Sequence, residues 1–362
     1  MRRLADDDVL RLRMAAQHLH RPRRRPAVDL VRHLTGVQAQ VLSAAGLALR
    51  ARTEGLTSNR VDQARLIDRS IVLTWAMRGT LHLVCAEDYG WLVPLVTEPR
   101  TANAHRRLEH EGVPRGQHDK AVRLVGKILG QEGPLTRREI AEELAARAVR
   151  TKGQAIAHLV WLAAAEGILC YGPPAGRDQR LVLVTDWLGH PRSMERGAAL
   201  AELAARYLSA HGPAQPVDLA HWSGLRPGDA RRAWAAVADR LVEVDTARGP
   251  RWVLRSRRER ASAGIIRLLP AFDEYLLGWK DREPTAPPTR WKKINRGGGW
   301  LRPVVLAGGR AVATWSTERS VKGMQLQVRS FSPLTAAIRR GVMSETRDVE
   351  RFLGTSVSMV LH

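Results

Sequence analysis

The residues with the least obvious structural role are two glutamines, Gln38 and Gln40, in the segment 35–40 (TGVQAQ) ahead of an apolar helix. A side-chain amide accepts hydrogen bonds through its oxygen and donates them through its nitrogen. Residues at i and i+2 do not share one helical face, so a pair acting together must lie on a turn or at a helix start. From spacing alone the two glutamines fit ordinary polar caps.

The usual catalytic constellations are missing from the sequence. It contains no zinc deaminase pattern, Walker loop, Ser/His/Asp order or paired-carboxylate nuclease cluster. Cys85 and Cys170 lie far apart, without CxxC or Cys/His spacing, which argues against zinc and against a disulfide framework. We expect both to be buried small hydrophobes, and we expect no metal and no cofactor.

Two acidic runs are candidate cation ligands. The run at 6–8 is better explained as charge at the start of a helix. Asp273 and Glu274 follow the apolar segment 268–272 and could ligate a cation, although a structural turn between strand and loop is the favoured alternative.

The charge balance is strongly basic, with 58 Lys+Arg against 36 Asp+Glu, a formal net charge of +22. Only seven of the cations are lysines, an arginine bias that a GC-rich genome would also produce. Codon usage explains why most of the cations are arginines, but it does not explain why they outnumber the acidic residues. The surplus favours a polyanionic partner, nucleic acid above all.

Length and composition indicate several folded domains. The chain exceeds the roughly 250–300 residues at which single hydrophobic cores stop growing, and 44% of its residues are hydrophobic. The charged N-terminus has no apolar segment, and no window reaches the roughly 18 apolar residues of a membrane span. We therefore expect a soluble cytoplasmic protein with no membrane contact, associated with the nucleoid through DNA.

A helix-helix-helix-strand-strand unit recurs along the chain. In 119–190, a helix at 121–129 and a Gly-Pro turn precede a second helix that Thr136 and Glu139 begin as a capping box. A third helix at 154–166 stops at Gly167, and strands at 168–172 and 180–184 follow. The same order recurs in 191–260, so the pattern predicts two tandem winged helices.

The two ends of the chain complete an α+β architecture. Residues 1–118 contain helical segments, a hairpin at 71–77 and 81–84, and expected helices at 86–95 and 100–111, which fit a third winged helix with elaborations. Residues 261–362 predict strands and one helix, at 333–353, in a small antiparallel β-barrel-like domain or sheet.

Cations concentrate around expected wings and turns, where phosphates would pass. Six arginines lie within 248–260, and a second cluster flanks the Asn-Arg-Gly-Gly-Gly tip of a hairpin expected at 290–300, which could press into a groove. A solvated basic face and a flexible glycine loop are the respective alternatives. The residues expected to contact DNA here are Arg231, Arg232, Arg248, Arg251, Arg255, Arg257, Arg258, Arg290, Lys292, Lys293 and Arg296.

Several motifs together resemble the AlkZ/YcaQ-type winged-helix DNA glycosylases. They are 34–40 (LTGVQAQ), 75–84 (WAMRGTLHLV), 268–278 (LLPAFDEYLLG), 302–306 (RPVVL), 309–310 and 314–315, in order over most of the chain. The resemblance implies three tandem winged helices and a C-terminal β-domain, arranged as a C around duplex DNA.

The resemblance also implies a catalytic role for the glutamines. The family signature is Gln-aliphatic-Gln or Gln-aliphatic-Asp, and Gln38-Ala39-Gln40 matches the first form, with Ala39 smaller than usual. It implies excision of N7-alkylated purines, including bulky adducts and interstrand crosslinks, often as self-resistance to DNA-alkylating antibiotics. We expect Gln38 to be the principal residue, with Gln40 as its partner in holding water.

The expected enzyme is a monofunctional glycosylase that acts as a monomer on double-stranded DNA carrying alkylated purines. Arg78 and His82, beside the turn of the hairpin, are further candidates for phosphate contact, with a purely structural hairpin as the alternative. The alternative function is a non-enzymatic winged-helix regulator or adduct-sequestering protein. The absence of a dimerisation heptad or effector domain speaks against a dimeric operator binder.

Overall fold

The computed structural model describes residues 3–21, 23–256, 261–320 and 323–362, which form an α+β fold. The chain packs as two compact units. Unit 1 comprises Met1–Asp62, Leu200–Trp222 and Pro227–His362, and unit 2 comprises Gln63–Ala199 and Ser223–Arg226. The four domain boundaries expected from the sequence stay a prediction.

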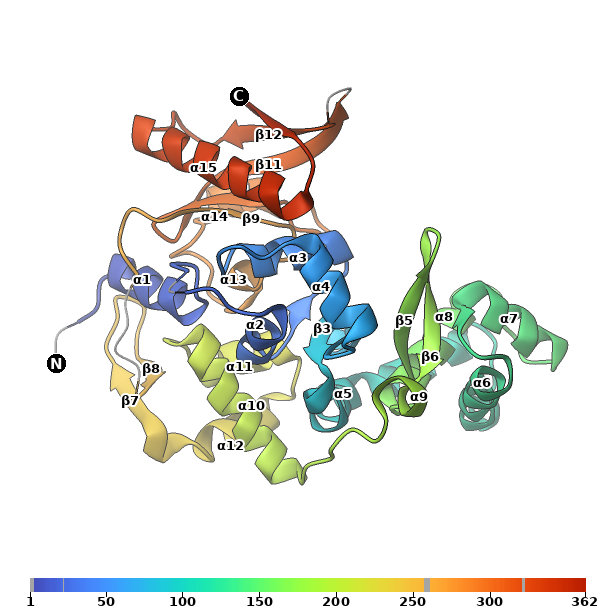
Figure 1. Ribbon diagram of the computed structural model, residues 1–362. Coiled ribbons are helices and arrows are strands. Elements are labelled where there is room, and N and C mark those ends of the chain that lie inside the picture. The colour runs from blue at the N-terminus through green and yellow to red at the C-terminus, as the bar shows by residue number, and fades with distance from the viewer. Residues whose placement is uncertain (1–2, 22, 257–260, 321–322) are drawn as a thin grey trace. The chain divides into compact units, whose positions relative to one another are not determined.

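Unit 2 is built on a sheet with strand order β3-β2-β5-β6-β4 (Figure 1). β2 and β3 form the expected hairpin, with Ile71 opposite Cys85 and Trp75 opposite Leu81. The elements of unit 2 are η1 (Gln63–Ile67), β2 (Ile71–Trp75), η2 (Met77–Gly79), β3 (Leu81–Cys85), η3 (Ala86–Asp88), α5 (Tyr89–His110), η4 (Arg115–Gln117), α6 (His118–Glu132), β4 (Leu135–Thr136), α7 (Arg137–Ala146), α8 (Ala155–Ala165), β5 (Leu169–Ala175), β6 (Asp178–Leu183) and α9 (Val184–Leu188).

The expected capping box begins α7. The Glu139 N–H donates to Thr136 Oγ1 at 3.3 Å, and the Thr136 N–H donates to Glu139 Oε2 at 2.7 Å. The hydrogen bonds from Thr136 lower the pKa of the Glu139 carboxyl. The prediction is confirmed, because both partners of this motif lie within one turn and need no tertiary support.

The core of unit 2 lies between its helices and its sheet. Leu108, Val125, Leu144 and Leu159 are among the fully buried side chains that α5, α6, α7 and α8 contribute. Cys85 and Cys170 are free and buried, as expected. Burial raises the pKa of the Cys170 thiol to about 12, so it stays protonated and packs as an apolar side chain.

One long helix replaces the two expected at 86–95 and 100–111. α5 runs without interruption from Tyr89 to His110 and contains Pro94 and Pro99. Proline inside a helix removes one hydrogen bond and usually kinks or ends the helix. The buried apolar face continues on both sides of the prolines, including Val96 and Ala104, so packing outweighs the lost bond.

Unit 1 combines the N-terminal helices with a two-stranded sheet, β7-β8, and a five-stranded sheet. Its elements are α1 (Asp6–Ala16), α2 (Ala27–Leu34), β1 (Val37–Gln38), α3 (Leu42–Arg50), α4 (Ser58–Asp62), α10 (Arg196–His211), α11 (Pro216–Ser223), α12 (Pro227–Ala235), η5 (Ala238–Arg240), β7 (Leu241–Val244), β8 (Arg251–Leu254), β9 (Ile266–Leu269), α13 (Glu274–Leu277), α14 (Pro288–Ile294), β10 (Val304–Ala307), β11 (Arg310–Ser320), β12 (Gly323–Ser330), α15 (Ala336–Leu353) and β13 (Val357–Leu361). The ends of α10 and α11 pass into unit 2.

The C-terminal sheet is open and mixed, so the expectation of an antiparallel barrel-like domain is wrong. The strand order is β13-β12-β11-β10-β9, and no pairing joins β9 to β13 among the described residues. β12 and β13 are parallel because α15 lies between them in the chain and returns it to the same direction (Figure 1). Val342 and Val349 of α15 pack into the core of this sheet. Because the helix covers that face, the sheet buries its apolar side chains without closing into a barrel.

A second correction concerns the basic cluster at 290–300. The expected hairpin strand before the glycines is the helix α14, which begins at Pro288. Proline favours the first turn of a helix because its φ is already helical and its missing N–H needs no partner there. Only the turn of the expected hairpin remains, closed by a bridge between Asn295 and Leu301, with Gly297 and Gly299 at positive φ.

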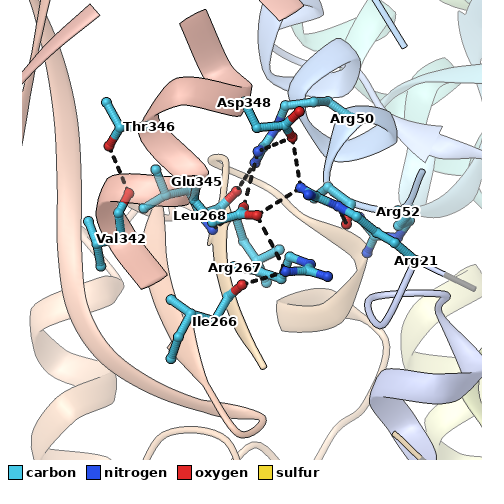
Figure 2. A network of polar contacts seen from close by, with 12 residues as sticks. Arg21, Arg50, Arg52, Ile266, Arg267, Leu268, Val342, Glu345, Thr346 and Asp348 are labelled. Atoms are coloured by element: carbon cyan, nitrogen blue, oxygen red, sulfur yellow. Dashed lines mark hydrogen bonds and ion pairs between the residues drawn. The ribbon is translucent and has the colours of Figure 1, made fainter. Parts of the chain in front are cut away.

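A buried ionic network ties the end of α3 to the C-terminal sheet within unit 1 (Figure 2). Arg50, which is fully buried, donates to Glu345 at 3.0 Å, to Asp348 at 2.9 Å and to the carbonyl of Leu268 at 2.7 Å. The Leu268 N–H donates to the same Glu345 carboxylate at 3.0 Å. Buried charges are tolerated only when paired in this way, so the network fixes α3 against β9 and α15.

Candidate active site

The turn after α2 places Gln38 in extended backbone. The Thr35 N–H donates to the Arg32 carbonyl at 3.1 Å and the Gly36 N–H donates to the Val31 carbonyl at 3.1 Å, the two bonds of a Schellman motif. Thr35 adopts φ 62° and Gly36 φ 134°, so the helix stops and the chain reverses into β1. Gln38 is the second residue of that strand.

Gln38 ends the strand β1 and Gln40 lies at the bend that leads to α3, whereas the spacing predicted a turn or a helix start for a pair that acts together. Gln38 is 7% exposed, and Gln40 is exposed in the connection to α3. The N-cap residue of α3 is Val41, whose side chain has no hydrogen-bond acceptor. Neither glutamine is the N-cap residue of α3, and the choice between a catalytic pair and ordinary polar caps stays a prediction.

A buried carboxylate holds the backbone of Gln38. The Gln38 N–H donates to Glu274 Oε1 at 2.8 Å, and the indole N–H of Trp222 donates to Glu274 Oε2 at 2.9 Å. Glu274 and Trp222 have no exposed surface. Each carboxylate oxygen thus fixes one donor, and charge-assisted bonds of this kind are among the stronger ones in proteins.

The neighbouring Asp273 serves structure and not a cation. Its side chain caps α13 by accepting from the Tyr275 N–H at 2.8 Å. Arg52 donates to both of its oxygens, at 2.8 and 2.9 Å, and also to the amide oxygen of Gln17 at 2.6 Å. Asp273 and Arg52 are fully buried. The structural alternative considered for the acidic pair is confirmed for Asp273.

Backbone strain accompanies the Gln38–Glu274 contact on both of its segments. Thr35 and Phe272 have φ values of 62° and 60°, a region that residues with a Cβ rarely adopt. They lie three and two positions before Gln38 and Glu274, respectively. Such outliers persist only where the surroundings fix them, and they gather at functional sites.

The arginines around the β7–β8 turn are held by carboxylates of unit 1. Arg248 forms an ion pair with Glu283 at 2.6 Å and with Asp6 at 3.4 Å, and Arg251 lies 3.7 Å from Asp281. Burial opposes the charge of Arg248, but Glu283 and the nearby acids raise its pKa overall. Arg248 and Arg251 therefore have acidic partners inside the protein, which the concentration of arginines in 248–260 did not indicate.

The other cations expected at the third unit have less protein contact. Arg231 and Arg232 are exposed on α12, where Arg232 forms an ion pair with Asp229. Arg255 is exposed and donates to the carbonyl of Leu241 at 3.4 Å. Arg257 and Arg258 lie outside the described residues.

The cluster around α14 is partly free of protein partners. Arg290 is half-buried and donates to the carbonyl of Ala311 at 3.2 Å. Lys292, Lys293 and Arg296 are exposed, and Lys293 lies 5.5 Å from the ring of Phe331. These three remain the best-placed candidates for phosphate contact among the cations named from the sequence.

The β2–β3 hairpin gives Arg78 and His82 different environments. Arg78 is half-buried at φ 59°. His82 is fully buried, and its Nδ1–H donates to the Thr80 carbonyl at 2.9 Å. Burial, helped by the charge of Arg78, lowers the pKa of His82 to about 3. A buried neutral imidazole offers no surface to a phosphate, which favours the structural alternative for His82.

The sequence did not indicate which residues hold the glutamine segment in place. Glu274 was expected to ligate a cation or, more in keeping with its position, to belong to a structural turn, and no role was expected for Trp222 or Arg52. The available signal was an acidic pair directly after a buried apolar segment, and it does not reveal the partner. Within the described parts of the chain, no group of three or more His, Cys, Asp or Glu side chains could hold a metal ion. No described helix is long and apolar enough to cross a membrane.

Comparison with known proteins defines the class to which this fold and site belong. The family model "DNA glycosylase AlkZ-like" matches residues 31–352. The chain therefore belongs to the AlkZ-like DNA glycosylase family, and it is a monofunctional glycosylase, an enzyme that hydrolyses the N-glycosidic bond.

Two comparisons point to the same relative. The "Interstrand DNA cross-link repair glycosylase" of Streptomyces sahachiroi is 32% identical over 370 residues, which cover 96% of each protein. The solved structure of Streptomyces sahachiroi DNA glycosylase AlkZ matches with a TM-score of 0.85 and 29% identity over all of both chains. The resemblance inferred from the glutamine motif and the other segments is confirmed.

Proposed function

We propose that this glycosylase releases N7-alkylated purines, and N3-alkyladenine, from duplex DNA, including bulky adducts or interstrand crosslinks. The observation that carries the proposal is the buried Gln38, whose backbone is fixed by Glu274 at 2.8 Å and whose side chain is an uncharged amide. An enzyme that relies on amides needs a substrate that is already activated. N7-alkylated guanine is such a substrate, because its positive charge weakens the glycosidic bond.

The chemistry divides between the substrate and the two glutamines. The cationic base leaves without strong acid catalysis, and positive charge develops at the sugar as it departs. The Gln38 amide oxygen accepts from a water and orients it toward the sugar carbon, and its NH₂ donates to a phosphate or sugar oxygen. Gln40 is the second partner of that water. The glycosidic bond breaks, and the base leaves with its electron pair as a neutral molecule. The water oxygen bonds to the sugar carbon, and one proton of that water passes to solvent.

The dependence on a cationic base and two uncharged amides limits the substrate range. An amide is too weakly basic to take a proton from water, so neutral undamaged purines are not released. A bulky or crosslinked base does not pass easily into a closed pocket, and we propose attack with the lesion largely left in the helix. The product is an abasic site.

Several winged-helix units would present DNA to this site. In residues 119–190, α6, β4, α7, α8 and the β5–β6 hairpin follow in winged-helix order, and β4 pairs with β6. In residues 191–260, α10, α11, α12, β7 and β8 repeat the order, and Ala214 bridges Trp252 of β8 where the first strand of the motif belongs. These pairings support two winged helices. The proposal also includes a third winged helix, in residues 1–118, and a C-shaped arrangement of the chain around DNA.

The name of the curated relative supports a role in DNA repair. The curated Streptomyces sahachiroi protein is an interstrand cross-link repair glycosylase, which supports crosslinked or alkylated DNA as the target here. The arginine-rich composition suits a GC-rich host. We propose that the protein acts as a monomer in self-resistance to a DNA-alkylating natural product.

Base release from defined lesions tests the proposal. Duplexes carrying N7-methylguanine, a bulky N7 adduct or an N7–N7 crosslink are incubated with the protein in EDTA, and released bases are measured. We expect release from the cationic lesions and none from a neutral lesion such as O6-methylguanine. Release of the neutral base alone, or sequence-specific binding without any release, contradicts the proposal.

A further inference from the structure

A hollow beside the β10–β12 face of unit 1 has no role in the site described above. It measures about 390 Å³, and it is lined by Arg296, Trp300, Arg302, Gln327 and Arg329 together with apolar side chains. Pockets that bind small molecules typically begin at about 300 Å³. The hollow can therefore hold one nucleotide and not a stacked base pair with its neighbours.

The charge of this hollow is entirely positive. Arg296, Arg302 and Arg329 are exposed, and no Asp or Glu is among its lining residues. Arg302 donates to the carbonyl of Lys293 at 3.2 Å, and within the described residues Arg296 and Arg329 form no ion pair with a carboxylate. Arg248, in contrast, already has acidic partners. Three cations around one cavity suit an anion such as a phosphate.

An aromatic platform borders the same hollow. Trp300 is 51% exposed, an unusual degree for so large an apolar side chain. Its backbone is fixed, because its N–H donates to Gly297 at 3.0 Å and its carbonyl accepts from the Arg296 N–H at 2.8 Å. Its ring lies 5.2 Å from that of Phe272. A held, exposed indole surrounded by arginines is typical of surfaces on which bases stack.

The hollow borders the segment that holds the backbone of Gln38. Phe272, which packs against Trp300, directly precedes Asp273 and Glu274, and Glu274 bonds the Gln38 backbone. Ala271 of the same segment lines the hollow, so a nucleotide bound there lies beside the residues that hold Gln38.

We infer that this hollow is a nucleotide-binding subsite for DNA. The phosphate lies among Arg296, Arg302 and Arg329, and the base packs against the Trp300 indole. The inference rests on the glycosylase acting on duplex DNA. It adds a contact that holds one nucleotide of the substrate strands outside the catalytic motif.

Binding measurements on four variants test the subsite. Fluorescence anisotropy with a labelled duplex containing a tetrahydrofuran abasic analogue is recorded over a range of salt, without any base release. We expect Trp300→Ala to weaken binding about tenfold, in the range that base–aromatic stacking contributes, and Trp300→Phe to restore most of it. Arg329→Gln is expected to reduce the slope of log affinity against log salt by about 0.9, one phosphate contact.

The matched control is Arg340→Gln, which removes an exposed arginine from α15, outside the hollow. It is expected to leave the salt slope unchanged. Wild-type affinity in Trp300→Ala, or equal slope changes in Arg329→Gln and Arg340→Gln, overturns the subsite. Because no base is released, failure of the proposed lesion specificity leaves these measurements unaffected and is detected separately.

Discussion

The Gln38 N–H donates to Glu274 Oε1 at 2.8 Å, across 236 positions of sequence. This bond joins the glutamine motif near the N-terminus to the acidic pair at 273–274. The second oxygen of Glu274 is taken by the Trp222 indole, so the carboxylate cannot turn without losing a partner. The backbone of Gln38 is therefore held by Glu274, whose own position is held by Trp222.

Replacement of Gln38 tests the catalytic assignment. Gln38→Ala is expected to lower single-turnover base release by about 10²- to 10³-fold, the loss seen when one positioned hydrogen-bonding group is removed from an active site. DNA affinity is expected to stay near wild type, and Gln40→Ala to have a smaller effect. Gln131→Ala, at an exposed position on α6, is the control. Full activity of the Gln38→Ala/Gln40→Ala double variant contradicts the assignment.

Glu274 is expected to act only through Gln38. In Glu274→Gln the amide has one acceptor oxygen, so its NH₂ group faces one of the two N–H donors and a bond is lost. We expect base release to fall about tenfold or more, since about 1.4 kcal/mol of lost positioning corresponds to a factor of ten. DNA affinity is expected to be unchanged.

A double-mutant cycle separates this role from general destabilisation. In a Gln38→Ala background, Glu274→Gln is expected to cause little further loss of activity, because the group that it positions is gone. Trp222→Phe, which removes only the indole donor, should give a milder effect. Additive losses in the cycle would show that Glu274 acts independently of Gln38.

The Arg50 network is expected to stabilise unit 1. Arg50→Met removes a fully buried guanidinium that pairs with Glu345 at 3.0 Å and with Asp348 at 2.9 Å, while Arg21 at 2.9 Å and Arg267 at 3.4 Å stay with Glu345. Breaking a buried pair costs about 3–5 kcal/mol in the free energy of unfolding, and the remaining arginines place the expected loss at the lower end of that range. The control is Arg351→Met, which removes a 37%-exposed partner of Asp348. Exposed pairs contribute about 0–1 kcal/mol. Equal losses in urea unfolding for the two variants would contradict the role of burial.

His82 is expected to make stability depend on pH. Its folded-state pKa is about 3, below the ordinary value of 6.5, so the unfolded state binds the proton first. The free energy of unfolding therefore falls as the pH drops through 6.5, by about 2 kcal/mol between pH 7 and pH 5 from this group.

Urea unfolding of wild type and His82→Asn at the two pH values measures this contribution. Asparagine keeps a donor for the Thr80 carbonyl but does not titrate. His211, whose pKa burial also lowers, is present in both proteins and cancels in the comparison. The same pH dependence in both proteins would assign the effect to other groups.

Local signals in the sequence predicted much of the secondary structure. Thr136 and Glu139 began α7 because a capping box involves two residues within one turn. The apolar alternation of 71–85 gave the β2–β3 hairpin, and Gly167 ended α8. The predictions that failed needed long-range information: α5 continues through two prolines because its apolar face is buried, and the C-terminal sheet stays open because α15 covers it.

The glutamine motif, the basic surplus and the family were determined by the sequence itself, because residue types and their order carry them. The tertiary structure decided which charges remain available for DNA: Arg248 is held by Glu283 and Asp6, while Arg296 and Arg329 face a hollow without acids. It also decided what holds the strand that carries Gln38. Glu274, Trp222 and Gln38 are distant in sequence and meet only when the core of unit 1 closes around them. No local propensity encodes such a meeting, since its hydrogen bonds form only after folding has excluded water.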